Sequence, residues 1–215
     1  MKLYGYFRSS AAYRVRIALN LKGLSYEAVS VHLVKDGGQQ FSEDYLAVNP
    51  TALVPTLQDG DLTLGQSMAI MEYLEEAYPS PALLPADLAG RARVRAIAQA
   101  IACDIHPLNN LRVLKYLKHN LQADDASKDA WYKHWIAVGL SSIESMLASS
   151  PYTGRFCHGD QPTLADLCLV PQLFNARRFG CDESAFPTVV RIDAACAELD
   201  AFRQAAPEQQ PDYVA

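Results

Sequence analysis

The hydrophobic pattern of this chain changes character at Pro79–Ser80–Pro81. Before this point, segments that alternate like strands are interspersed with helical repeats, whereas after it only helical spacing recurs. Closely spaced prolines neither continue a helix nor pair inside a sheet, so they mark a linker. We therefore predict an α/β domain over residues 1–80, a linker over 81–86 and an all-α domain over 87–215.

The first 80 residues have the element order of a thioredoxin-like fold. A β-α-β unit followed by a β-hairpin and a helix forms a small mixed sheet covered by helices. Two apolar runs that flank Asp59–Gly60 indicate the hairpin. The pattern predicts a strand over 2–7, a helix from Ser10 to Gly23, a strand over 26–31, hairpin strands over 54–57 and 62–64, and a helix from Gln66 to Tyr78.

The remaining residues show only helical periodicity. Ile97, Ile101 and Ile105 share one face of a single long helix that we expect from Leu88 to Leu121. Pro107 lies inside that helix and should bend it. Further elements expected in this domain are helices over 127–149, 164–179 and 188–205, and a loose polar tail from Pro207.

Composition excludes several classes of function. The chain has 215 residues, of which 19 are basic and 24 acidic, and its net charge of −5 does not favour binding to nucleic acid or to an anionic membrane. No apolar run is long enough to span a bilayer, and the first residues lack the apolar region of a secretory signal. The five cysteines form no CxxC pair, so we expect no metal site, and a reducing, cytoplasmic location is favoured.

Arg8–Ser9–Ser10 lies where the first strand gives way to the first helix. A helix N-terminus has unpaired N–H groups and a partial positive charge, so it favours an anion, including a thiolate. A serine hydroxyl at this position can donate to the same anion. Serine is also a preferred N-cap residue, so a purely structural role remains open.

Two further segments could offer backbone groups to a ligand. Val54–Pro55 precedes a strand, and a proline there, which has no N–H, belongs at an edge or a bulge. Gln66–Ser67 opens the last helix of the first domain. Ser67 could cap that helix, or a ligand carboxylate could take the free N–H groups instead.

Polar residues also gather in the helical domain. His106 and Asn110 are four residues apart and would share a helix face beside the bend at Pro107. This arrangement suggests the wall of a cleft, with a solvated face as the alternative. Arg177–Arg178 closes another helix and could either bind a dicarboxylate or interact with the helix dipole.

Two kinds of residue that are often catalytic, an aspartate and the cysteines, are not expected to be catalytic here. Thr163 and Asp166 fit a capping box, although Asp replaces the usual Glu or Gln, so we assign Asp166 to helix capping. None of the cysteines lies beside an arrangement of His and Asp that would activate it, so a cysteine nucleophile is not expected.

Five segments of the chain carry a resemblance to a known family. They are FRSSAAYRVRIAL, the KDGGQQF loop, NPTALVPTL, GQSMAIMEYLEE and PTLADLCLVPQ. In this order, and over nearly the whole chain, they resemble the zeta class of glutathione transferases, the maleylacetoacetate isomerase family. The resemblance implies a thioredoxin-like domain followed by an all-helical domain, glutathione as cofactor, and a homodimer.

The resemblance also implies roles for individual residues. Arg8, Ser9 and Ser10 match the catalytic turn, where the serines hold the sulfur of glutathione. Arg8, Arg112 and Arg178 resemble the cations that bind the substrate carboxylates. The residues that match contacts to glutathione are Ser9, Ser10, Gln40, Val54, Pro55, Gln66, Ser67, His106, Asn110, Leu111 and Arg112.

One position departs from the family pattern. The family commonly reads Ser-Ser-Cys at the catalytic turn, whereas this chain has Ala11 in the third place. Residue 11 cannot perform the chemistry of a cysteine, which strengthens Ser9 as the partner of the thiolate. The bond before Pro55 is expected to be cis by the same resemblance.

The activity that the resemblance implies is a glutathione-dependent cis–trans isomerisation. The family converts maleylacetoacetate to fumarylacetoacetate in aromatic amino-acid breakdown. A glutathione thiolate adds to the double bond, the resulting single bond rotates and the thiol leaves, so glutathione is not consumed. The helix end beside Ser9 would raise the thiolate population, and the arginines would hold the carboxylates and stabilise the enolate.

Other functions remain open from the sequence. A maleylpyruvate isomerase would use the same mechanism and the same arginines. A glutathione transferase that conjugates small electrophiles such as α-halo acids needs an open apolar pocket, and a wall of arginines argues against one. A binding module would have no reason to keep Ser9 beside an anion site, and a thiol oxidoreductase would need a cysteine in the first turn.

Overall fold

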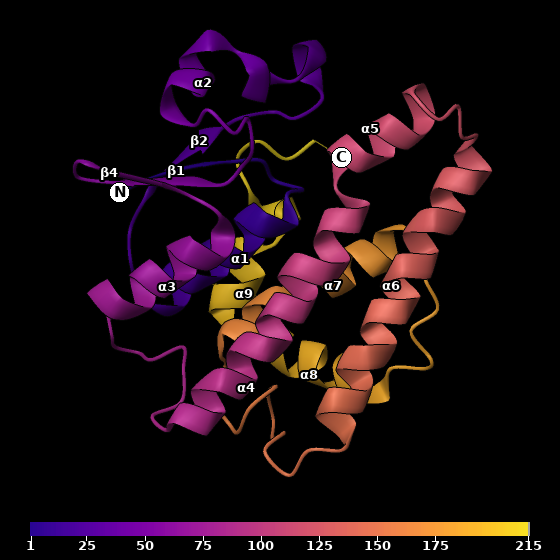
Figure 1. The fold of residues 1–215 in the computed structure, drawn as a ribbon. Coiled ribbons are helices and arrows are strands. Elements are labelled where there is room, and N and C mark those ends of the chain that lie inside the picture. The colour runs from indigo at the N-terminus through magenta and orange to yellow at the C-terminus, as the bar shows by residue number, and fades with distance from the viewer. Residues whose placement is uncertain (215) are drawn as a thin grey trace. The chain divides into compact units, whose positions relative to one another are not determined.

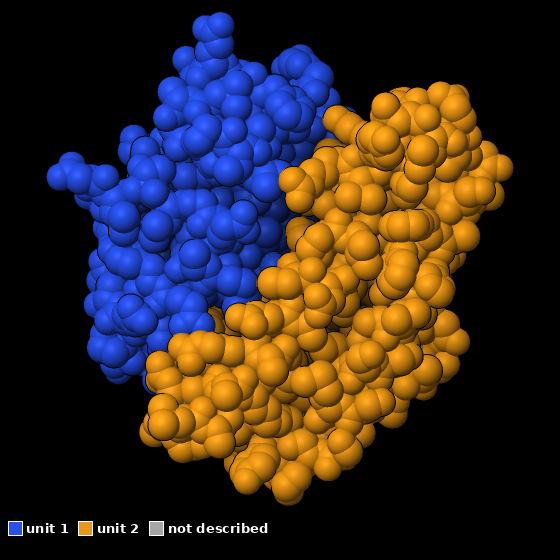
Figure 2. Space-filling view, viewed as in Figure 1, with its two compact units in different colours: residues 1–83, 197–215 blue, residues 84–196 orange. Residues whose placement is uncertain are grey.

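A computed structural model describes residues 1–214 of the chain. The chain forms two compact units. One is made of residues 1–83 together with the described residues from 197 onward, and the other of residues 84–196. Figure 2 shows the first unit in blue and the second in orange.

The first unit is built on a mixed sheet. Its strands are β1 (Lys2–Gly5), β2 (Glu27–Ser30), β3 (Thr56–Asp59) and β4 (Leu62–Gly65). Their order across the sheet is β2-β1-β3-β4. β1 is parallel to β2 and antiparallel to β3, and β3 and β4 form the predicted hairpin. This topology confirms the thioredoxin-like fold.

Helices cover this sheet. α1 (Ser10–Leu21) and α3 (Ser67–Ala77) lie on one face and α2 (Glu43–Val48) lies on the other (Figure 1). The apolar side of α1 is buried, and Ile17 is fully inaccessible. Gly23 follows α1 with a φ of +65°, a left-handed conformation that glycine adopts without steric penalty, so the helix ends where the sequence predicts.

The C-terminal part of the chain completes the first unit. Helix α9 (Asp200–Ala205) packs against α1. Asn20 Nδ2 donates to the carbonyl of Ala201 at 3.0 Å, and Arg16 Nε donates to the carbonyl of Ala205 at 2.9 Å. Both donors belong to α1, so the two most distant parts of the sequence form one structural unit.

The segment after α9 is ordered by tertiary contacts. A 3-10 turn spans Pro207–Gln209. Beyond it, Asp212 Oδ2 accepts from the backbone N–H of Phe7 at 3.2 Å and from Ser30 Oγ at 2.9 Å. For residues 207–214 the prediction of a loose tail is therefore wrong, because distant partners that local composition does not reveal can hold polar residues in place. Residue 215 of the predicted tail lies outside the described residues.

A buried ion pair joins the C-terminal ends of α1 and α3. Lys22 Nζ lies 2.9 Å from Glu75 Oε2 and also donates to the carbonyls of Tyr78 and Pro81, at 2.7 and 2.9 Å. The same Glu75 oxygen accepts from the N–H of Leu83 at 2.9 Å. The ion pair thus fastens the start of the predicted linker to the sheet-covering helices.

The second unit is helical. Its helices are α4 (Leu88–Gln99), α5 (Leu111–His119), α6 (Asp125–Ala148), α7 (Leu164–Arg178) and α8 (Pro187–Ala197). They confirm the all-helical character predicted for this region. The helix predicted over 188–205 is divided into α8 and α9, because Leu199 between them has extended backbone (φ −91°, ψ 130°).

The single long helix expected in this unit is also broken. A π-helical segment at Ala100–Ile105 follows α4, and a 3-10 turn at His106–Asn109 follows that. Pro107 removes a backbone donor from this stretch. Asn110 then takes an extended conformation (φ −65°, ψ 145°) and caps α5. His106 and Asn110 therefore do not share one helix face, and that prediction is wrong.

Helix α7 begins with the predicted capping box. The N–H and hydroxyl of Thr163 donate to Asp166 Oδ2 at 2.7 and 2.9 Å, and the N–H of Cys157 donates to Asp166 Oδ1 at 2.8 Å. Burial raises the pKa of Asp166, and these hydrogen bonds oppose that shift. These contacts fasten the backbone of Cys157 and Thr163 and complete the capping box, which confirms the structural assignment of Asp166.

No helix within residues 1–214 is both long and apolar enough to cross a membrane. In the same part of the chain, no group of three or more His, Cys, Asp or Glu side chains is arranged to hold a metal ion.

Candidate functional site

The turn between β1 and α1 places Ser9 at the N-cap of α1. Ser9 Oγ accepts from the N–H of Ala12 at 3.2 Å. The hydroxyl proton remains available to a second acceptor, because capping uses only a lone pair of the oxygen. The capping and ligand-binding interpretations of Ser9 are therefore compatible. Ser10 is the first residue of α1 and is buried.

Arg8 projects from the same turn as an exposed cation. Its Nε and Nη2 donate to the hydroxyl of Tyr6 at 3.2 and 2.9 Å, and its guanidinium carbon lies 5.0 Å from the centre of the Phe7 ring. These contacts orient the guanidinium group without neutralising it. No carboxylate of the described residues forms an ion pair with Arg8, so its charge is available to an anionic ligand.

The start of α3 differs from the sequence interpretation. The N-cap is Gln66, not Ser67, and the helix has no side-chain cap. Ser67 is the first helical residue, and its Oγ accepts from Arg14 Nη1 at 3.2 Å. Gln66 has a φ of +66°, a left-handed conformation that is unfavourable for a side-chain-bearing residue and that clusters at ligand sites.

Two further predicted residues have backbone or side-chain groups without partners. The Val54–Pro55 peptide bond is cis, as the resemblance implies, and neither backbone polar group of Val54 is bonded within the described chain. Gln40 is buried, and its Oε1 has no hydrogen-bond partner. Gly38 makes room for this side chain, because a Cβ there would lie 2.7 Å from Gln40 Nε2.

The polar groups of the first unit fit the parts of a glutathione molecule. Ser9 provides a hydroxyl proton at a helix N-terminus, which suits a thiolate. The backbone of Val54 suits a peptide, and the uncapped start of α3 at Ser67 suits a carboxylate. The unpartnered Oε1 of Gln40 could accept from a ligand N–H. These unsatisfied groups are those that a bound tripeptide would satisfy.

The remaining predicted residues belong to the second unit. His106 opens the 3-10 turn that follows the π-helical segment, and Asn110 Oδ1 accepts from the N–H of Arg112 at 3.1 Å. Leu111 is the first residue of α5, and the Arg112 side chain is exposed. Asn110 therefore has a structural role in helix capping, which does not use its amide N–H groups.

Arg178 is the last residue of α7, and its guanidinium carbon lies 4.8 Å from the centre of the Phe179 ring. That ring stacks on Tyr132 at 3.5 Å between centroids. Burial raises the pKa of Tyr132 to about 12, against the opposing effect of the Arg178 cation. The neighbouring Arg177 is bound to carboxylates of Glu183 and Asp193. Arg177 is therefore neutralised by structural partners.

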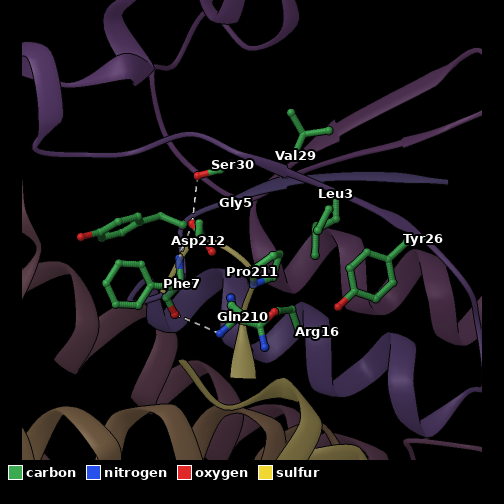
Figure 3. Close-up of a pocket in the computed structure, with 12 residues that line it drawn as sticks. Leu3, Gly5, Phe7, Arg16, Tyr26, Val29, Ser30, Gln210, Pro211 and Asp212 are labelled. Carbon is green, nitrogen blue, oxygen red and sulfur yellow. Dashed lines mark hydrogen bonds between the residues drawn. The ribbon is translucent and has the colours of Figure 1, made fainter. Parts of the chain in front are cut away.

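The first unit also contains a pocket of about 220 Å³, which lies apart from the site predicted from the sequence. It is lined by residues of β1, β2, α1 and the C-terminal segment, among them Arg16, Ser30 and Asp212, and by none of the predicted site residues (Figure 3). Phe7 also lines the pocket, and both of its backbone polar groups form hydrogen bonds, the N–H to Asp212 and the carbonyl to Arg16 Nη2 at 3.0 Å.

The sequence did not predict the roles of Arg16 and Asp212, which line this pocket, or of Arg14, which contacts Ser67. Arginines interleaved in the apolar helix after Ser9 were a visible signal, but the pattern did not tell which of them is buried. Both are buried, and desolvation lowers the pKa of Arg16 to about 10, which still leaves it charged at neutral pH. Nothing in the polar C-terminal sequence signalled that Asp212 reaches Phe7.

Comparison with known proteins defines the family. The glutathione S-transferase N-terminal domain family matches residues 3–82. Over 212 residues the chain is 53% identical to the maleylpyruvate isomerase of a Ralstonia species, with 99% of each chain covered.

Two solved structures superpose closely on the whole chain. One is a holo structure of maleylpyruvate isomerase, described as a bacterial zeta-class glutathione S-transferase, with a TM-score of 0.97 and 52% identity. The other is the maleylacetoacetate isomerase of Methylobacterium extorquens AM1 with bound malonate and glutathione, with a TM-score of 0.96 and 44% identity. Each match covers 100% of both chains. The fold and the sequence identity to these proteins identify a glutathione transferase. The chain belongs to the zeta class, the family of maleylacetoacetate and maleylpyruvate isomerases.

Proposed function

We propose that this protein is a glutathione-dependent cis–trans isomerase that converts maleylacetoacetate to fumarylacetoacetate. The observation that carries the proposal is the turn after β1. There the Ser9 hydroxyl caps α1 with its oxygen and keeps its proton for a ligand, beside the exposed and unneutralised cation of Arg8. The maleylacetoacetate isomerase of Methylobacterium extorquens AM1, with which the chain shares its fold and 44% of its residues, supports the same reaction.

In the proposed mechanism, bound glutathione supplies a thiolate that adds reversibly to the substrate double bond and so permits rotation. Ser9 donates its hydroxyl proton to the sulfur, and the N-terminus of α1, with Ser10 at its first position, favours the negative charge. Arg8, Arg112 and Arg178 bind the carboxylates of the substrate, and the planar guanidinium fork suits a bidentate contact. Malonate bound in the Methylobacterium relative supports a dicarboxylate site.

The other predicted residues are proposed to bind the rest of glutathione. In the first unit, Val54 pairs with the peptide backbone next to Pro55, Gln40 binds along the tripeptide, and Gln66 and Ser67 bind the γ-glutamyl end. The second unit contributes His106, Asn110, Leu111 and Arg112. Each of these assignments follows from the family resemblance.

Maleylpyruvate is the second candidate substrate, because the Ralstonia relative at 53% identity is a maleylpyruvate isomerase. Both substrates are dianionic cis-enones that the same arginines could bind. Conjugation of small electrophiles is a third possibility for a member of this family, and the exposed cation of Arg8 argues against uncharged electrophiles.

The test is the loss of ultraviolet absorbance of each cis substrate, with and without glutathione. Fast conversion that requires glutathione but leaves its concentration unchanged would support the isomerase, and the ratio of kcat/KM values would select the substrate. Conversion that consumes glutathione would indicate conjugation instead. The absence of any conversion by protein that still binds glutathione would contradict the proposal.

We further propose a homodimer in a reducing, cytoplasmic compartment. The dimer follows from the family resemblance. The reducing compartment is supported by the five cysteines, none of which forms a disulfide in the described structure. Light scattering of the purified protein would test the dimer.

A further inference from the structure

Helices α1 and α3 are joined by two side-chain contacts with the same sequence offset of 53 residues. Near the C-terminal ends, Lys22, the residue that follows α1, meets Glu75 of α3. About two turns earlier on each helix, Arg14 of α1 meets Ser67 of α3. The first contact joins a cation to a carboxylate, whereas the second joins a cation to a neutral hydroxyl. The two contacts are therefore alike in position but different in charge balance.

Arg14 is a buried cation without a counter-charge in the chain. Its relative exposure is 1%, and its Nε and Nη2 have no hydrogen-bond partner. Within the described residues, its one polar contact is the bond from Nη1 to Ser67 Oγ, and no carboxylate forms an ion pair with it. Burial of an unpaired guanidinium group is unfavourable, since the lost hydration is not replaced. A function that uses the charge would explain why it is buried there.

The surroundings of Ser67 favour an anion. It is the first residue of α3, a helix with no side-chain cap, so the positive end of the helix dipole is directed at this position. Gln66, which precedes it, has the left-handed φ of +66° that brings the backbone into this arrangement. Because Ser67 Oγ accepts from Arg14, its hydroxyl proton is directed away from the guanidinium group and can donate to a ligand.

We propose that Arg14 is a positioning residue for the γ-glutamyl carboxylate of glutathione. Arg14 orients the hydroxyl of Ser67, which in turn donates to the carboxylate. Its positive charge also balances the negative charge of that carboxylate. This inference rests on the proposed function, since it requires that glutathione binds with its γ-glutamyl end at Ser67. Within the chain, the charge of Lys22 is balanced by Glu75. In the complex, the charge of Arg14 would be balanced by the carboxylate of the ligand.

The test compares two ligands in calorimetric titrations. One is glutathione, and the other is γ-aminobutyryl-cysteinylglycine, the same tripeptide without the γ-glutamyl carboxylate. Arg14→Met removes the charge and keeps an unbranched apolar chain, and Arg14→Lys is the matched control that keeps the charge. We expect Arg14→Met to weaken glutathione binding by tenfold or more and binding of the analogue by less than threefold, with Arg14→Lys between wild type and Arg14→Met. Equal weakening of both ligands, or of neither, would overturn the inference.

Thermal unfolding distinguishes the proposed role of Arg14 from a purely structural one. Without ligand, Arg14→Met should have a Tm no lower than that of the wild type, because an unpaired buried charge is replaced by an apolar group. With glutathione, its Tm should rise less than that of the wild type. A large fall in the Tm of the ligand-free variant would mean that Arg14 is structural and would overturn the inference.

If Arg14→Met does not fold, Ser67→Ala separates the hydroxyl from the charge. This variant should lose affinity for glutathione and keep its affinity for the analogue. A failure of the wild-type protein to bind glutathione would contradict the proposed function itself. Binding by the wild type with no preference for the carboxylate would contradict only the role of Arg14.

Discussion

The hydroxyl of Ser9 can serve two partners at once, because its oxygen accepts one hydrogen bond while its proton donates another. The bond it accepts, from the N–H of Ala12, fixes the oxygen at the N-terminus of α1. A sulfur near this proton would also lie at the positive end of the helix dipole. Capping thus holds in place the hydroxyl that we propose to be catalytic.

Substitution of Ser9 should separate catalysis from binding. We expect Ser9→Ala to lower kcat by about tenfold or more. Without the hydroxyl the pKa of the bound thiol should rise, and a rise of one pKa unit corresponds to about 1.4 kcal/mol. The Kd of glutathione should change far less. Because the cap is also lost, the stability should fall by about 1 kcal/mol. Turnover, calorimetry and thermal unfolding measure the three effects, and Ser9→Thr, which keeps a hydroxyl, is the control. An unchanged kcat would remove Ser9 from the mechanism.

Single residues were predictable from sequence where the signal is local. Ser9 was visible because the strand pattern changes to a helix pattern there. The capping box at Thr163 and Asp166 was visible from its spacing alone. Arg14 was not, because its burial depends on the packing of α1 against α3, and Ser67 was assigned to the cap position because the left-handed conformation of Gln66 has no signature in the sequence.

At the scale of elements, the buried ion pair between α1 and α3 should behave differently from a surface pair. We expect Lys22→Met to destabilise the protein by about 3–5 kcal/mol, because it leaves the Glu75 carboxylate buried without its partner. The double variant Lys22→Met/Glu75→Leu should lose less, since no unpaired charge remains. Lys118→Met, which breaks an exposed pair with Asp125, should change the stability little, because solvent screens the two charges.

Urea unfolding of these variants checks the comparison. The ordering expected is a large loss for the single buried variant, a smaller one for the double variant and the smallest for the surface variant. A double variant that is less stable than Lys22→Met would show that the pair contributes net stability beyond avoiding an unpaired charge.

The C-terminal segment should support the turn after β1, which we propose to be catalytic. Asp212 binds the N–H of Phe7, two residues before Ser9. We expect Asp212→Ala to lower kcat by several-fold and to reduce stability by about 1–3 kcal/mol, because a buried N–H loses its acceptor. Glu208→Ala removes an exposed carboxylate from the same segment and is the matched control. Equal effects of the two substitutions on steady-state kinetics would argue against a specific role of Asp212.

The break between α4 and α5 shows the limit of periodicity at this scale. Apolar residues keep helical spacing up to Ile105, so the pattern predicts a continuous helix. Pro107 and the capping preference of Asn110 break the helix instead. Both are local signals, and the prediction of one long helix gave them less weight than the apolar pattern. The thioredoxin-like order of elements was predictable because it depends only on where strands and helices alternate.

For the whole molecule, the first unit needs residues from both ends of the sequence. We expect a fragment of residues 1–83 to be poorly folded, because the faces of α1 that contact α9 through Asn20 and Arg16 would be exposed to water. A fragment in which a flexible linker joins residues 1–83 to residues 197–215 should show more helix by circular dichroism and a more cooperative thermal transition. Two fragments of equal stability would contradict this view.

The contact between α1 and the end of the chain also sets an order of events during synthesis. A ribosome makes roughly 5 to 20 residues per second, so residues 84–196 take roughly 6 to 23 s to emerge after the thioredoxin-like sheet has been made. Throughout that interval the carboxylate that binds Phe7 does not yet exist. A nascent or prematurely terminated chain would therefore carry Ser9 and Arg8 on a turn that lacks one of its anchors. The turn nearest the start of the message would thus be among the last parts of the molecule to reach its final form.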